Sequence, residues 1–96
     1  MEFEFTETVF LWKADAAWHF VPLPADLADM IRELFGHLTA GWGSIRVRAT
    51  IGATSWQTSI FPDKRRGTYI LPLKAQVRRA EQVGEGDSVT IAIMMM

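Results

Sequence analysis

The stretch IRVRATIGATSWQTSI, residues 45–60, decides the fold of this chain. Up to residue 51 apolar side chains alternate with arginine and threonine, and from residue 55 Trp, Thr and Ile alternate with polar neighbours. A period of two is typical of strands that bury one face. Between the two runs, Gly52-Ala53 is short enough for a hairpin turn in which glycine supplies a positive φ. The stretch therefore predicts two adjacent antiparallel strands.

The same alternation predicts four more strands on either side of this hairpin. They cover residues 3–11, 18–21, 68–71 and 89–95. Glu7 interrupts the apolar row of the first strand, so we expect a bulge or a sheet edge there. The chain thus has six predicted strands.

Two helices are predicted, over residues 24–37 and 72–82. The first has apolar residues at steps of three and four behind Pro24, and the second ends before Gly84. Each follows a Leu-Pro pair and precedes a glycine-bearing turn and a strand, as two copies of one strand-helix-strand unit would. We therefore expect a mainly β fold, a small six-stranded pseudobarrel capped by two helices, with residues 1–96 as a single domain.

Composition excludes several classes of function. The chain has no cysteine, so disulfides, thiolate metal sites and a cysteine nucleophile are excluded. The acidic start lacks the pattern of a secretory signal, and the longest apolar stretch, residues 91–96, is too short to cross a membrane. We expect a cytoplasmic protein without a membrane partner. A net charge of −1 argues against strong nonspecific nucleic-acid binding, although residues 34–79 hold eight of the ten basic residues.

Several blocks of the sequence, in this order, resemble a known family. They are Trp18–Val21, Leu23-Pro24, Gly43–Ile45, Trp56–Pro62, Tyr69–Lys74, Val77-Arg78 and Gly86–Val89. The chain resembles the family called domain of unknown function 1905. The resemblance implies a double-split-barrel-like pseudobarrel, similar to a duplicated, single-chain version of the swapped-hairpin unit of AbrB and MazE-like transcription regulators. It implies no biochemical activity.

Lys74 and Arg78 are the best candidates for a binding site. They stand four residues apart on the second predicted helix, near backbone N–H groups that attract anions. Arg79, Thr58 and Ser59 join them if the strands bring these residues near. We therefore expect a noncatalytic module for a small anionic ligand or a protein partner, without a cofactor. The competing interpretation is a solvated amphipathic helix in which Arg78 pairs with Glu81.

A DNA-binding or regulator-like module is the first alternative. Its candidate residues are Lys64, Arg65, Arg66, Arg46 and Arg48, with Trp42 or Trp56 stacking on bases. The competing interpretation is a polar hairpin tip beside the outward row of a strand, which the near-neutral charge of the chain favours.

An enzyme of unrecognised type is the second alternative. His19 and His37 lack the spacing of metal ligands, no Gly-x-Ser-x-Gly motif is present, and no pair of carboxylates suits acid–base work. We therefore predict no metal site and no catalytic residue. The four tryptophans are expected to fill the barrel more than to line a pocket, with Trp42 the one expected to be exposed. An edge near residues 94–96 leaves both a monomer and a homodimer open.

Overall fold

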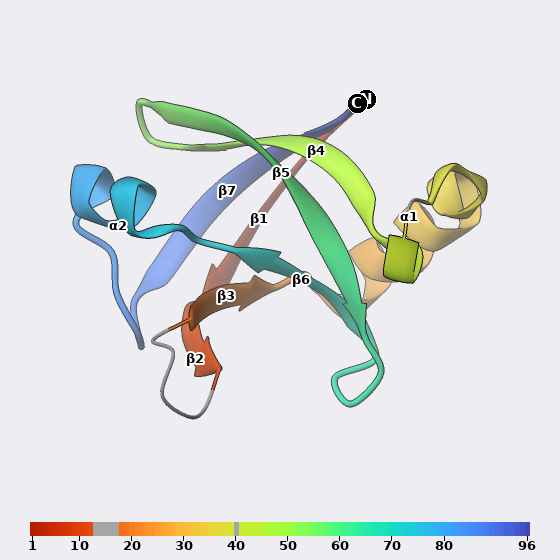
Figure 1. Cartoon of the computed structure of the whole chain (residues 1–96), viewed down its shortest axis with the longest axis horizontal. Helices are drawn as coiled ribbons and strands as arrows, with labels where there is room; N and C mark the ends of the chain where they lie inside the picture. Colours follow the sequence, from red (N-terminus) through yellow and green to blue (C-terminus); the bar gives the residue numbers. More distant parts are fainter. Residues whose placement is uncertain (13–17, 40) are drawn as a thin grey trace.

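The computed structural model describes residues 1–12, 18–39 and 41–96 (Figure 1). In this part of the chain, seven strands form one antiparallel sheet with the order β1-β7-β4-β5-β6-β3-β2. The strands are β1 (Glu2–Thr8), β2 (Phe10–Trp12), β3 (Trp18–Pro22), β4 (Ile45–Ile51), β5 (Thr54–Asp63), β6 (Thr68–Pro72) and β7 (Ser88–Met95). Figure 1 shows the sheet curled into a half-barrel, with the two chain ends side by side. The mainly β class is confirmed.

The strand count differs from the prediction because the first predicted strand is two strands. The ladder breaks at Val9, whose amide donates to the Asp87 carbonyl and whose carbonyl accepts from the Gly86 amide, both at 2.9 Å. Before the break β1 pairs with β7, and after it β2 pairs with β3. One continuous stretch thereby supplies both edges of the sheet, and this curls the sheet. The edge expected near Glu7 is present.

The hairpin predicted from residues 45–60 is confirmed. β4 and β5 pair from Ile45↔Ile60 to Ile51↔Thr54, and Gly52 in the turn has φ 56°. Val47 and Ile60 are fully buried on the inner face of the curled sheet. The arginines of β4 lie on the outer face, as the alternation requires.

Both helices are shorter than predicted. α1 spans Ala25–Phe35 and is followed by 3-10 turns at Gly36–Leu38 (η1) and Gly41–Gly43 (η2). α2 spans Ala75–Glu81. It begins late because the Leu73 amide donates to the His19 carbonyl at 2.9 Å, which keeps the chain in the sheet. It ends at Glu81, and Gln82 caps it in the left-handed conformation at φ 55°, two residues before Gly84.

The helices cover two sides of the half-barrel (Figure 1). α1 buries Ala28 and Ile31, and α2 buries Val77, against an otherwise largely aliphatic core. α2 is also tied to the β4–β5 hairpin, because the Thr54 hydroxyl donates to the Glu81 carboxylate at 2.6 Å. No helix in the described part of the chain is long and apolar enough to cross a membrane.

Candidate functional site

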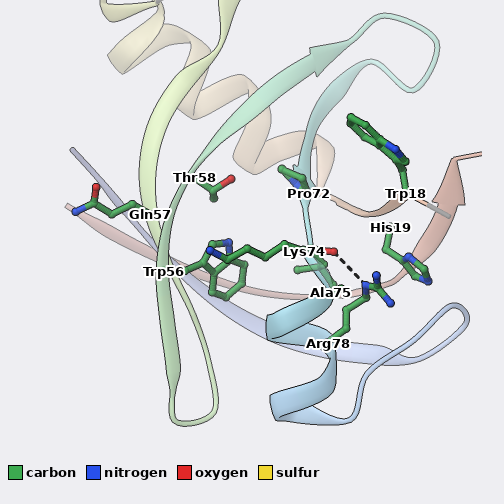
Figure 2. A pocket seen from close by; sticks show the side chains of 10 residues that line it. Trp18, His19, Trp56, Gln57, Thr58, Pro72, Lys74, Ala75 and Arg78 are labelled. Atoms are coloured by element: carbon green, nitrogen blue, oxygen red, sulfur yellow. Dashed lines mark hydrogen bonds between the residues drawn. The ribbon is translucent and has the colours of Figure 1, made fainter. Parts of the chain in front are cut away.

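A pocket of about 330 Å³ opens where β5 and β6 separate (Figure 2). These strands pair over only three positions, from Asp63↔Thr68 to Phe61↔Ile70, and the earlier part of β5 pairs with β4 instead. The start of α2 and the start of β3 complete the walls. The lining residues are Trp18, His19, Trp56, Gln57, Thr58, Pro72, Leu73, Lys74, Ala75 and Arg78.

Two cationic side chains line this pocket, and both come from the start of α2. Lys74 directly precedes α2 and is exposed, whereas Arg78 lies one turn later and is half-buried. The Arg78 Nε donates to the Leu73 carbonyl at 3.1 Å, which fixes the guanidinium beside the first turn of the helix. In Figure 2, Lys74 extends toward Trp56 and Arg78 extends toward His19. In this view the two charged groups therefore lie toward opposite ends of the pocket wall.

Of the three other residues predicted for the site, only Thr58 lines the pocket, whereas Ser59 and Arg79 do not. Ser59 lies on the opposite face of β5, because neighbouring strand residues point to opposite sides, and its hydroxyl accepts from the Arg46 guanidinium at 3.4 Å. Arg79 is exposed and lies outside the lining. The structure thus gathers Lys74, Arg78 and Thr58, and it leaves Ser59 and Arg79 out.

The pairing of Arg78 with Glu81, considered above, is replaced by other partners. Glu81 accepts a hydrogen bond from Thr54, and Arg78 donates to the Leu73 carbonyl. Glu81 therefore anchors the helix and does not neutralise Arg78. The positive charge of Arg78 remains on the pocket wall.

His19 was not predicted as a wall residue, and Trp18 was expected to pack in the barrel more than to line a pocket, yet both line this one. β3 reaches the pocket only because its residues pair with β6 and the Leu73 amide bonds the His19 carbonyl, a contact between distant segments. Gln57 also lines the pocket, but Figure 2 shows its side chain directed away from it. No local pattern in the sequence signals these placements.

The expectation that tryptophans mainly fill the barrel is wrong for Trp12 and Trp18. Trp56 is buried and contributes to the core and to the pocket wall. Trp12 and Trp18 are exposed, and Trp42 is 93% exposed, as expected, with a left-handed φ of 66°. Aliphatic residues fill most of the core, and the rings of Trp12, Trp18 and Trp42 are exposed on the surface.

The basic residues of the alternative nucleic-acid surface are spread along two elements. Lys64, Arg65 and Arg66 form the β5–β6 turn, and Arg46 and Arg48 stand on the outer face of β4. Arg46 lies opposite Ser59, four residues before the end of β5, which is roughly 13 Å along the strand. The turn and the arginine row therefore occupy separate parts of the surface.

Arg66 is already engaged within the chain. Its guanidinium donates to the Asp63 carboxylate at 2.8 Å and lies 3.7 Å from the centre of the Phe10 ring. Burial raises the pKa of Asp63, but hydrogen bonds from the Arg66 side chain and from two backbone amides outweigh it and lower the pKa overall. The contact with Phe10 joins the β5–β6 turn to β2, and the ion pair with Asp63 compensates much of the charge of Arg66.

Comparison with known proteins identifies the family to which the chain is similar. A family described as Domain of unknown function (DUF1905) matches residues 5–93, a range that contains every residue lining the pocket. No functionally curated protein matches the chain. Within residues 1–12, 18–39 and 41–96, no group of three or more His, Asp or Glu side chains is placed to hold a metal ion.

Proposed function

The chain belongs to the family described as Domain of unknown function (DUF1905), and we propose that it is a noncatalytic binding module for a small anionic ligand. The ligand occupies the pocket between β3, β5 and α2. The observation that supports this function is that Lys74 and Arg78 line the same pocket.

The chemistry of the pocket suits such a ligand. Its volume of about 330 Å³ lies at the small end of the range for ligand sites, which usually combine apolar walls with a few polar groups. Trp56, Pro72 and Leu73 supply apolar surface, and Thr58 supplies a hydroxyl. With its Nε held by the Leu73 carbonyl, Arg78 keeps its terminal N–H groups for a carboxylate or a phosphate.

The duplication suggested by the sequence belongs to the same proposal. The units β3-α1-β4 and β6-α2-β7 have the same order of elements. Equivalent strands of the two units pair antiparallel, β3 with β6 and β4 with β7, as a pseudo-twofold relation requires. We propose on this basis that the chain is a fused pair of AbrB-like units, with the pocket at the start of the second helix.

The experiment compares two variants that each remove one positive charge from the same region. A panel of carboxylated and phosphorylated metabolites is screened by thermal shift, and hits are titrated by calorimetry. Lys74→Ala removes a cation of the pocket wall, and Arg79→Ala removes an exposed cation outside it. We expect Lys74→Ala to weaken binding about five- to tenfold, less than a buried charge-assisted hydrogen bond because solvent screens the exposed ammonium, and Arg79→Ala to weaken it less than twofold.

Two results would overturn the proposal. One is a panel in which no compound stabilises the protein, or in which both variants weaken binding equally. The other is salt-sensitive binding of duplex DNA in a gel shift that is lost when Lys64, Arg65 and Arg66 are changed to alanine. The second result would favour the regulator-like alternative.

A further inference from the structure

A cluster of aromatic rings lies outside the core, on the part of the sheet formed by β2 and β3. We call Phe10, Trp12, Trp18 and Phe20 the outer aromatic cluster. Phe20 is its centre, with ring centroids 5.9 Å from Phe10, 5.8 Å from Trp12 and 6.2 Å from Trp18. Phe20 itself is buried and is not part of the main core. The cluster therefore forms a separate support beneath the exposed tryptophans.

Trp18 is the member of this cluster that reaches the pocket. It lines the pocket beside His19, whereas Trp12, its partner across the strands, does not. Trp18 is 60% exposed although Phe20 supports its ring. A large ring that is held in place yet open to solvent has little conformational freedom left to lose when another ring packs against it.

We propose that the ligand carries a flat aromatic ring that stacks on Trp18, joined to the carboxylate or phosphate that Lys74 and Arg78 attract. This inference rests on the proposed function and names the class of ligand. Figure 2 shows Trp18 and Trp56 on different strands at the pocket, with Lys74 extending toward Trp56 and Arg78 toward His19, the neighbour of Trp18. The site thus offers aromatic surface and positive charge within one opening.

An aromatic ring gains more here than a saturated ring of similar size. Both remove similar apolar area from water, but only the flat ring adds the favourable geometry of stacked aromatic pairs. This difference corresponds to about three- to tenfold in affinity. The preference for a flat ring is therefore measurable separately from the preference for an anion.

The experiment uses two pairs of probes with equal charge. Benzoate is compared with cyclohexanecarboxylate, and phenyl phosphate with cyclohexyl phosphate, each titrated by NMR into the full chain. We expect the aromatic member of each pair to bind about three- to tenfold more tightly. In Trp18→Leu this preference disappears, because leucine offers apolar surface to both members of a pair but no ring for stacking.

Two further variants separate stacking from general support of the fold. Trp12→Leu removes a ring that also packs on Phe20 but lies outside the pocket, and Trp42→Leu removes the most exposed tryptophan. Both should keep the aromatic preference.

Three results would count against these proposals, and they are distinguishable. Equal affinity for the flat and the saturated probes overturns the aromatic inference and leaves the anion proposal standing. Loss of the preference in Trp12→Leu as well as in Trp18→Leu also overturns it, because the cluster would then act only on stability. Failure of all four probes to bind overturns the proposed function itself.

Discussion

Substituting Gly52 by alanine should loosen α2 from the hairpin that carries much of the pocket wall. Gly52 has φ 56°. A Cβ at this position would clash with Oε1 of the Glu81 carboxylate and would lie 3.1 Å from its Cδ. The same carboxylate accepts the 2.6 Å hydrogen bond from Thr54. Because the tip of a glutamate is flexible, we expect the carboxylate to move away and this hydrogen bond to break.

Two effects add up to the expected loss of stability. A left-handed backbone costs an alanine about 1 kcal/mol relative to glycine. The lost hydrogen bond has a charged acceptor but is only partly buried, so it contributes about 1 to 1.5 kcal/mol more. Gly52→Ala should therefore lower the free energy of unfolding by about 2 to 2.5 kcal/mol.

Gly67 provides the matched control. It also has a left-handed φ, 69°, but a Cβ there would meet no atom within 4 Å. Urea unfolding should show that Gly67→Ala loses only about 1 kcal/mol. In a Glu81→Ala background the excess loss at Gly52 should vanish, since the group that clashes is gone. Equal losses at the two glycines, or an excess that persists without Glu81, would refute this account of how α2 is docked.

Three further outcomes follow from the contacts described above. The folded pKa of Asp63 lies below its ordinary value of 3.8, so its contribution to stability is present above that pH and is lost as the pH falls through the folded pKa. In urea unfolding between pH 6 and 3, the free energy of unfolding of Asp63→Asn should therefore fall less steeply with decreasing pH than that of the wild type. Arg66→Lys keeps the charge but loses the planar contact with Phe10, so thermal unfolding should report a loss of about 0.5 to 1 kcal/mol, and no change would contradict the contact. Ile60→Ala empties a fully buried position and should cost about 2 to 5 kcal/mol in urea unfolding, and a loss below about 1 kcal/mol would mean that Ile60 is not in the core.

The parts of the fold that depend on neighbours in sequence were predictable. Alternation in residues 45–60 gave the hairpin, and its turn is the predicted Gly52-Ala53. The errors lie where distant partners decide. The break at Val9 depends on Asp87 and Gly86, and the late start of α2 depends on the bond between Leu73 and His19.

In the candidate site too, the placements set by neighbours in sequence were predictable and those set by distant partners were not. Lys74 and Arg78 share a helix turn, so their proximity to one pocket could be expected from spacing alone. Thr58 was grouped with Ser59, although a strand must separate two consecutive side chains. Trp18 could not be placed, because β3 meets the pocket only through its pairing with β6.

The central claim is that the pocket between β3, β5 and α2 receives the anionic ligand. The most direct test is an amide and indole NMR titration of the full chain with phenyl phosphate. The largest shifts should fall on Thr58, Lys74 and Arg78 and on the indoles of Trp18 and Trp56. Shifts concentrated on residues 64–67, or no shifts at all, would contradict the claim.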